Sequence, residues 1–203
     1  MVGLAVVVAG CGGSARHTAA TTTTGIRPAA QLRGLIPQPL PVKPSFTLTD
    51  TSGRPFDFAG KTRGKLTYLY FGYTHCPDAC PATMSDISYA LRLQKQAVRQ
   101  RIAVVFVTVD PRRDTRAVLR TWLDHYSRSF VGLTGTPRQL AAVERAAGVP
   151  PGPQGPTSSG KNYSVAHSSI LFAYSPDGRA HVVYAQGFKP GDYAHDMPLL
   201  LGL

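Results

Sequence analysis

Two cysteines, Cys76 and Cys80, follow directly after an apolar run that predicts a buried strand, with three residues between them. Pro81 comes next, and because proline is tolerated only near the first turn of a helix, a helix must begin within about one turn of it. The pair therefore spans a strand-to-helix junction, where the amides of the helix start favour thiolate over thiol. Two such sulfurs can hold a soft metal ion or be oxidised to a disulfide.

The spacing of the pair favours the metal but leaves the disulfide open. Side chains four residues apart on a helix have Cβ atoms about 5–6 Å apart, whereas a relaxed disulfide requires about 3.5–4.5 Å. Metal–sulfur bonds of about 2.3 Å, the value for zinc, allow two sulfurs to stand up to about 4.6 Å apart. The loop before Cys80 can adjust, so a disulfide there is strained and not forbidden.

Two thiolates make an incomplete metal site, so a third ligand is expected among the six histidines. His167 ranks first, because it precedes a predicted strand and follows a long Pro/Gly loop that would let an ion enter. The alternative is a strand-end histidine bonded to backbone. His75, beside Cys76, is expected to point away or to modulate the thiolate. The other four histidines fall in an N-terminal tether, on helices or at a strand start: His17, His125, His195 and His181.

Strands and helices alternate along the rest of the chain and would position these residues. Residues 46–50 and 55–58 flank a Gly-containing turn and predict a β-hairpin. Further strands are expected over residues 66–71, 102–109, 130–133, 169–174 and 181–186, and helices over residues 84–98, from an N-cap at Asp114, over 137–147 and over 190–201. This order predicts an α/β, thioredoxin-like fold with a central sheet flanked by helices and an extra N-terminal β-hairpin.

The third cysteine, Cys11, ends an apolar run that begins at Met1. Val8-Ala-Gly-Cys11 looks like a bacterial lipobox, in which the cysteine is lipidated, so residues 1–11 are expected to be a lipoprotein-type signal segment, although no Lys or Arg precedes the run. About ten apolar residues are too few to span a bilayer, which requires roughly twenty. Residues 12–44, rich in Ala, Thr and Pro, are expected to form a disordered tether.

The remaining residues, 45–203, are enough for one domain with its own core. The chain is 43% hydrophobic and 16% charged, and its net charge is +11. The basic residues are dispersed and are not interleaved with aromatics, which argues against nucleic acid as a partner. An anionic membrane surface suits the charge better, and simple solubility is the plainer alternative. Together with Cys11, these features predict an extracytoplasmic protein that is lipid-anchored to the cell membrane.

Three segments in this order resemble the Sco/SenC family of copper-delivery proteins: Tyr73-Thr-His-Cys-Pro-Asp-Ala-Cys-Pro81, Val109-Asp-Pro-Arg-Arg-Asp-Thr115 and Val165-Ala-His-Ser168. The resemblance implies a thioredoxin-like fold and one copper ion, Cu(I) or Cu(II), bound through Cys76, Cys80 and His167. It also implies a partner, the copper-bearing subunit of cytochrome c oxidase or another exported cuproprotein. Family members help to assemble the oxidase's binuclear copper centre, either by delivering copper or by reducing the cysteines of that centre.

Ala166 departs from the commonest family pattern, in which an acidic residue precedes the histidine. If that acid orients the imidazole, this chain needs another partner for the ring or binds the metal less tightly. Asp78 could supply negative charge near the cysteines or cap the helix. Asp110 and Asp114 are expected to be structural, the first at an Asp-Pro turn and the second as a helix cap.

The favoured role is a metallochaperone, not an enzyme in the turnover sense. The rival is a thiol–disulfide oxidoreductase that cycles Cys76 and Cys80 against thiols of the apo-oxidase or of another exported protein, with His75 lowering the pKa of the exposed thiol. His167 separates the two hypotheses, because a dithiol reductant does not need a distant imidazole.

Overall fold

The computed structural model describes residue 1, residues 32–151 and residues 163–203. The predicted signal segment beyond Met1, the lipidation site Cys11 and residues 12–31 of the predicted tether lie outside the described residues. Within the described part, no helix combines the length and the apolar character needed to cross a membrane.

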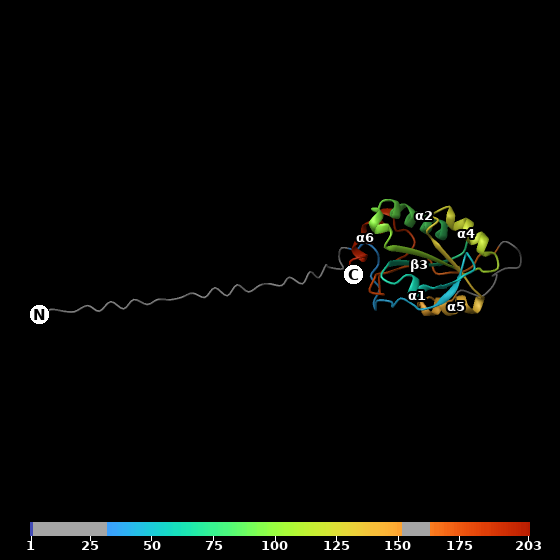
Figure 1. Cartoon of the computed structure of the whole chain (residues 1–203), viewed down its shortest axis with the longest axis horizontal. Coiled ribbons are helices and arrows are strands. Elements are labelled where there is room, and N and C mark those ends of the chain that lie inside the picture. The colour runs from blue at the N-terminus through green and yellow to red at the C-terminus, as the bar shows by residue number, and fades with distance from the viewer. Residues whose placement is uncertain (2–31, 152–162) are drawn as a thin grey trace.

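A seven-stranded mixed sheet forms the centre of the molecule, in the order β2-β1-β5-β4-β3-β6-β7 (Figure 1). The strands are β1 (Thr47–Asp50), β2 (Pro55–Asp57), β3 (Leu66–Gly72), β4 (Ile102–Thr108), β5 (Val131–Thr134), β6 (Leu171–Tyr174) and β7 (Ala180–Tyr184). The three central strands β3, β4 and β5 are parallel to one another, and the other neighbours are antiparallel. The predicted hairpin is confirmed as β1–β2, and it joins the sheet beside β5.

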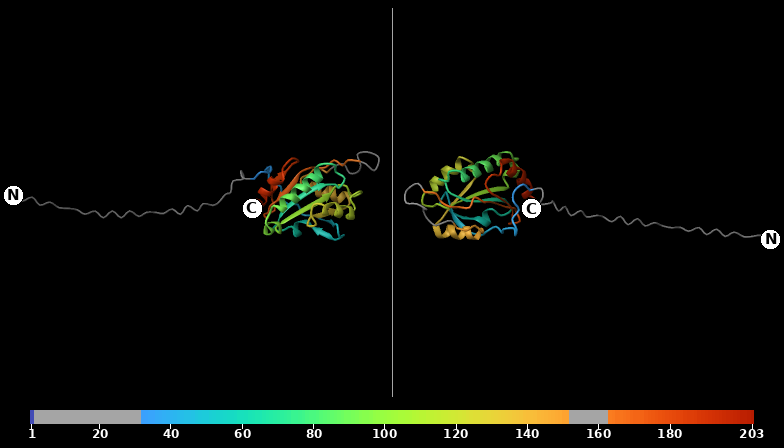
Figure 2. Two further views of the ribbon diagram at one scale, coloured as in Figure 1. Left: turned by 90° about the horizontal axis from the view of Figure 1, so that it is seen from above. Right: turned by 180° about the vertical axis from the view of Figure 1, so that it is seen from behind.

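Helices cover both faces of this sheet, as the two views in Figure 2 also show. One face carries α2 (Ala79–Arg92), α4 (Arg116–Asp124) and α6 (Pro190–Leu200), and the other carries α1 (Phe58–Lys61) and α5 (Pro137–Ala146). The predicted α/β architecture is therefore confirmed. The helix expected over residues 84–98 is interrupted, because Lys95 adopts an extended backbone that separates α2 from the short α3 (Gln96–Arg99).

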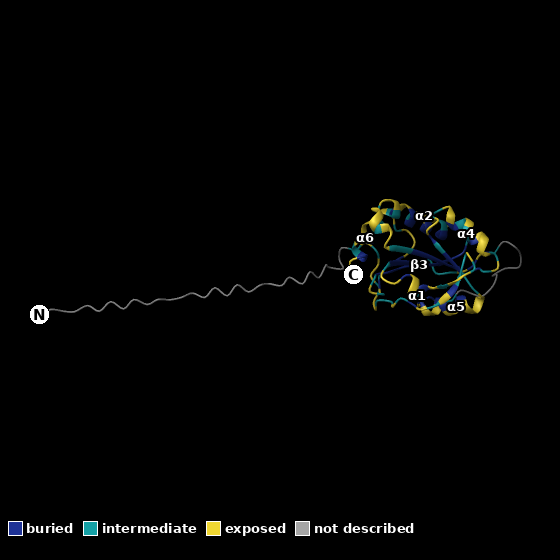
Figure 3. Ribbon diagram, in the orientation of Figure 1, coloured by how far each residue is buried: buried dark blue, intermediate teal, exposed yellow. Residues whose placement is uncertain are grey.

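Strand alternation explains why the sheet can be buried on both faces. Along β3, Tyr68 and Tyr70 join the core beneath α2, α4 and α6, whereas Leu69 and Phe71 join the core beneath α1 and α5. Successive side chains of a strand point to opposite faces, so a continuous apolar run fits a strand that is covered twice. The buried residues lie along the sheet and on the inner sides of the helices (Figure 3). This rigid centre positions the ends of β3 and β4.

Residues 32–44 correct the predicted boundary of the tether, because they pack on the domain and are not a free spacer. Leu35 forms a bridge with Val183, and Val42 forms one with Arg179, along the outer edge of β7. The backbone N–H of Arg33 donates to both carboxylate oxygens of Asp196 at 2.9 and 3.0 Å. Composition did not predict this docking, because its partner is a single buried carboxylate far along the chain, on α6.

Lys43, in the same segment, is half-buried, and its amine contacts Thr62 and Thr67. Its Nζ donates to the carbonyl oxygen and Oγ1 of Thr62, both at 3.1 Å, and to Oγ1 of Thr67 at 2.9 Å. Burial lowers the pKa of Lys43 from 10.5 to about 8, although the charge of Asp177 opposes the shift. The folded state therefore releases this proton at a lower pH than the unfolded chain does.

This difference predicts a pH dependence of stability. Between about pH 8 and pH 10.5 the unfolded chain binds more protons at Lys43 than the native chain, so the free energy of unfolding should rise with pH in that window. The Lys43→Met variant lacks the titrating amine. Urea unfolding of both proteins across this range should show the wild type gaining stability relative to the variant. A gap that stays constant from pH 7 to pH 10.5 would contradict the assignment.

Candidate metal centre

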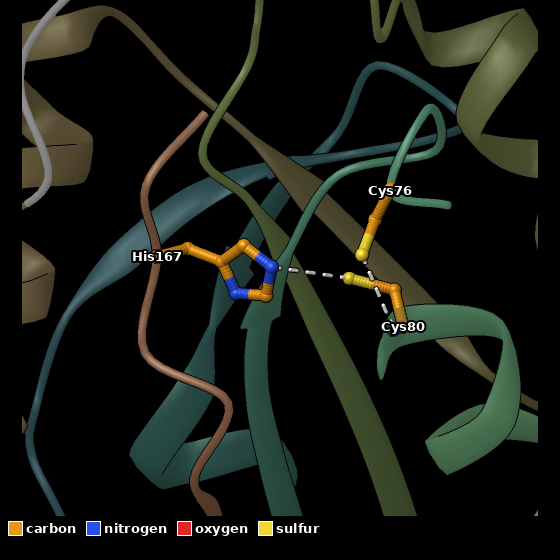
Figure 4. A group of neighbouring side chains, drawn as sticks. All are labelled: Cys76, Cys80 and His167. Carbon is orange, nitrogen blue, oxygen red and sulfur yellow. Dashed lines mark hydrogen bonds between the residues drawn. The ribbon is translucent and has the colours of Figure 1, made fainter. Parts of the chain in front are cut away.

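The structure brings Cys76, Cys80 and His167 together, with one ligand atom of each lying within 4.8 Å of the others (Figure 4). The topology explains the meeting. β3 ends at Gly72 and delivers the two cysteines, whereas β6 runs antiparallel to β3 and therefore begins at the same end of the sheet. The segment that leads into β6 carries His167 to this same end of the sheet. The ligand roles of these three residues remain a prediction, but their proximity does not depend on it.

Cys80 lies in the first turn of α2 and is fully buried. Its Sγ is 3.6 Å from Nε2 of His167. Burial raises the pKa of the Cys80 thiol, outweighing a backbone hydrogen bond from Tyr73 that lowers it, and the neighbouring Cys76 raises it further. The expectation that the helix start favours thiolate is therefore wrong for Cys80, because desolvation of the charged form is the larger effect.

Cys76 occupies the loop before α2 and is half-buried. The backbone N–H of Cys80 donates to Sγ of Cys76 at 3.4 Å, so it is the sulfur of Cys76 that receives an amide of the helix start. Both cysteines are free thiols. Of the two, Cys76 is the more accessible to an incoming ion or protein, whereas Cys80 forms the inner wall of the site.

His167 is held by backbone and by aromatic rings. Its Nδ1 lies 3.0 Å from the carbonyl oxygen of Ser168. A carbonyl can only accept, so Nδ1 carries the proton and Nε2 turns its lone pair toward Cys80. The rings of Tyr73 and Tyr70 contact the imidazole at centroid distances of 5.4 and 6.2 Å, with interplanar angles of 83° and 74°. The Ser168 carbonyl thus supplies the orienting partner that Ala166 cannot.

Asp114 connects the cysteine loop to β4 and does not cap a helix, which corrects the sequence prediction. Its buried carboxylate accepts from the backbone N–H of Thr74 at 3.0 Å, from the Thr74 hydroxyl at 2.6 Å and from the Thr108 hydroxyl at 2.7 Å. Burial raises the pKa of Asp114, and these hydrogen bonds oppose the shift. Thr115 is the N-cap of α4 instead, since its side chain accepts from the N–H of Val118.

Arg113 links the cysteine loop to the segment that carries His167, a role that was not predicted from the sequence. Its guanidinium lies 3.6 Å from the ring centroid of Tyr163 and 5.6 Å from that of Tyr73. It also pairs with Asp110, which accepts a hydrogen bond of 2.8 Å from the Tyr163 hydroxyl. Tyr163 precedes His167 by four residues and Tyr73 precedes Cys76 by three. The pair Arg112-Arg113 inside the second motif was the feature of the sequence that could have indicated this role.

The remaining polar residues considered from the sequence lie apart from this cluster. Nδ1 of His75 is 3.0 Å from the hydroxyl of Thr74, and its ring does not join the group of three. Asp78 makes no side-chain cap bond and accepts instead from Nε2 of Gln186 at 3.0 Å. Among the other described histidines, the ring of His125 lies against the backbone carbonyl oxygen of Trp122. The rings of His181 and His195 lie against the carboxylates of Asp177 and Asp196, respectively.

Two sulfurs and one imidazole nitrogen fit a soft or borderline metal ion. Thiolates favour Cu(I), and imidazole is a good ligand for Cu(II), so this donor set can hold either oxidation state. Structural zinc prefers four ligands in a closed site, whereas three donors with one partly exposed sulfur leave room for a ligand from another protein. The geometry thus defines a class: a protein with an α/β sheet fold and an open, cysteine-rich metal-binding centre.

Comparison with known proteins gives this class its family. Residues 36–201 match the model of the SCO1/SenC family. The chain is 37% identical over 141 residues to a protein of Stutzerimonas stutzeri, which covers 68% of each chain. It is 34% identical over 154 residues to the mitochondrial SCO1 homolog of Mus musculus, covering 73% of this chain but about half (52%) of the mouse protein. The chain belongs to the SCO1/SenC family.

Solved structures agree with this membership. The structure of Bradyrhizobium japonicum ScoI with copper bound superimposes with a TM-score of 0.69 at 30% sequence identity, and the match covers 78% of this chain and 99% of that one. A thiol:disulfide interchange protein of the thioredoxin family from Chlorobium tepidum shares the fold, with a TM-score of 0.54 at 17% identity over 80% of this chain and 97% of that one. The predicted thioredoxin-like fold is confirmed.

Gly72, at the end of β3, leaves the space that the Cys80 sulfur occupies. A Cβ at this position would lie 2.6 Å from Sγ of Cys80, 2.9 Å from Cε1 of Tyr70 and 3.0 Å from Cζ of Phe106. The Gly72→Ala substitution should therefore displace the sulfur and lower the affinity for copper at least tenfold, besides costing about 1–3 kcal/mol of stability through overpacking. Competition with a chelator of known affinity would measure the first effect and urea unfolding the second.

Gly132→Ala provides the matched control for Gly72→Ala. A Cβ at position 132 would lie 2.7 Å from Cδ1 of Leu123 and 3.0 Å from Cγ of Leu119, which is similar crowding on β5 and away from the three ligand candidates. This variant should lose comparable stability and keep the affinity of the wild type. Equal losses of copper affinity in both variants would show that Gly72 acts through general stability alone.

Proposed function

We propose that this protein is a copper carrier that binds one copper ion through Cys76, Cys80 and His167 and passes it to another protein. The observation that carries the proposal is the convergence of two thiols and an imidazole nitrogen within 4.8 Å at the carboxyl end of the central strands. The copper-bound solved relative at 30% identity supports copper as the ion. In this site the chain's residues supply two sulfurs and the oriented Nε2 of His167.

The architecture of the site suits transfer better than permanent storage. Cys80 is fully buried and Cys76 is half-buried, so the metal would be held from inside and reached from outside. Burial keeps the thiol of Cys80 protonated, and metal binding must displace that proton because a metal ligand is a thiolate. A recipient that offers its own thiolates at the Cys76 side can take over the coordination step by step.

The proposed recipient and location follow from the sequence motifs. The Sco/SenC resemblance implies the copper-bearing subunit of cytochrome c oxidase, or another exported cuproprotein, as the recipient. The lipobox-like Val8-Ala-Gly-Cys11 supports a lipid anchor at Cys11 outside the cytoplasm. The docking of residues 32–44 leaves residues 12–31 as the spacer between that anchor and the domain.

Copper titration of the reduced chain tests the metal site. The wild type should bind one Cu(II) per chain and show thiolate-to-copper charge-transfer absorption. Cys80→Ser and His167→Ala should each weaken binding by about a hundredfold or more, beyond the 10–100-fold typical of residues that merely support a ligand. His181→Ala, whose ring faces Asp177, is the control and should bind like the wild type. Wild-type affinity in His167→Ala would remove this residue from the site.

A thiol–disulfide oxidoreductase is the second candidate, favoured by the presence of two free thiols at one helix start. His167 should contribute little to that activity. In the His167→Ala variant the reduction potential of the Cys76–Cys80 couple should shift by less than about 30 mV, the equivalent of a tenfold change in the equilibrium constant. Equilibration with glutathione buffers measures it. A wild-type chain that cycles its disulfide readily but binds no copper at micromolar concentration would favour this second function.

A further inference from the structure

The end of the sheet opposite to the metal centre is predominantly basic, and Asp124, which ends α4 beside it, is paired with Arg120. The three segments that lead into β3, β4 and β5 are residues 59–65, 91–101 and 125–130, and parallel strands place their amino ends side by side. These segments hold eight Lys and Arg residues and no Asp or Glu: Lys61, Arg63, Lys65, Arg92, Lys95, Arg99, Arg101 and Arg128. We call this surface the basic end face. An open groove of about 730 Å³ crosses it.

The charges of the basic end face are available to a partner. Seven of the eight residues are exposed and Lys65 is half-buried. None of the eight takes part in an ion pair formed by the described residues. Arg92 donates to the hydroxyl of Ser88 at 2.8 Å, and Arg101 donates to the carbonyl oxygen of Leu201 at 3.3 Å. Both partners are neutral, so the positive charge is not compensated within this part of the molecule.

Apolar side chains accompany the basic ones on this face. Leu93, between Arg92 and Lys95, is 57% exposed, and Tyr89, one turn earlier on α2, is 50% exposed. An exposed leucine and an exposed tyrosine beside a row of cations form the pattern of surfaces that lie in a lipid headgroup layer, where the cations meet anionic lipid and the apolar groups enter the interface. A site for one small anion would instead require cations that converge on a single point.

The course of the chain fits the same orientation. The carbonyl of Leu201 accepts from Arg101, which places the C-terminal end of α6 at the basic end face. The described segment 32–151 begins beside α6, where the backbone N–H of Arg33 donates to Asp196, and Figure 1 shows its blue start near the C-terminus. We propose that the basic end face lies against an anionic lipid surface, so that the Cys76–Cys80–His167 cluster at the opposite end of the sheet points away from it. This inference extends the proposed membrane location and does not depend on copper.

Vesicle binding by the full chain, without copper and without lipid modification, tests the proposal. Vesicles of phosphatidylcholine with about one third phosphatidylglycerol should bind the chain, and binding should weaken as salt is raised. The triple variant Arg63→Gln, Lys95→Gln, Arg99→Gln removes three exposed charges of the face. Each should lower the partition coefficient about fivefold, so the triple variant should bind on the order of a hundredfold more weakly.

A matched variant removes the same net charge from the other end of the molecule: Arg54→Gln, Arg116→Gln, Arg138→Gln. It should lose much less binding than the first. Equal losses in the two variants, or binding to pure phosphatidylcholine as strong as to the anionic vesicles, would overturn the proposal. The first result would reduce the effect to net charge, and the second would assign it to the apolar N-terminal residues.

A reporter at the proposed contact distinguishes insertion from attraction at a distance. In Leu93→Trp the added fluorescence should shift to the blue when anionic vesicles are present, because the ring enters the interface. In Val118→Trp, an exposed position on α4, it should not shift. A shift at position 118 alone would show that another face of the molecule meets the lipid. Neither outcome affects the copper titration, so the two proposals fail separately.

Discussion

Parallel pairing of β3 with β4 is the constraint on which the rest of the structure depends. The register from Leu66–Ile102 to Gly72–Thr108 brings the carboxyl ends of both strands to the same end of the sheet. The cysteine loop leaves one strand, and the segment that carries Asp110, Arg113 and Asp114 leaves the other. Hydrogen bonds from Thr74 to Asp114 then join the loops, so a ligand-bearing loop is held by a buried carboxylate in the segment that follows the neighbouring strand.

The metal centre combines burial with access. Full burial of Cys80 against Gly72 opposes the charged thiolate, whereas Cys76 stays within reach of solvent and accepts an amide hydrogen bond. The imidazole of His167 is fixed from behind by the Ser168 carbonyl and flanked by two tyrosine rings. Each group is therefore oriented by its own contacts within the protein, which reduces the ordering entropy that binding must overcome.

Local signals in the sequence predicted the elements well and the connections between them poorly. Pro81 located the start of α2 to within two residues, and the apolar runs predicted β3 and β4. Spacing ranked His167 first among the histidines but left a backbone-bonded histidine as the alternative. In the structure Nδ1 lies against backbone while Nε2 faces Cys80, so the backbone bond does not exclude the predicted ligand role. Asp114 was misread as a cap, since its partners Thr74 and Thr108 become neighbours only through strand pairing.

The docked segment before β1 has a consequence for the exposed edges of the sheet. A seven-stranded open sheet has two edges, and each exposes backbone groups to which a second chain can pair. At β2 the edge is three residues long and begins with Pro55. At β7 the N–H and carbonyl of Leu35 and the carbonyl of Pro41 are bonded to the outer side of the strand. Residues 32–44 thus close the longer edge against aggregation, and a chain trimmed to its motif-bearing domain would reopen it.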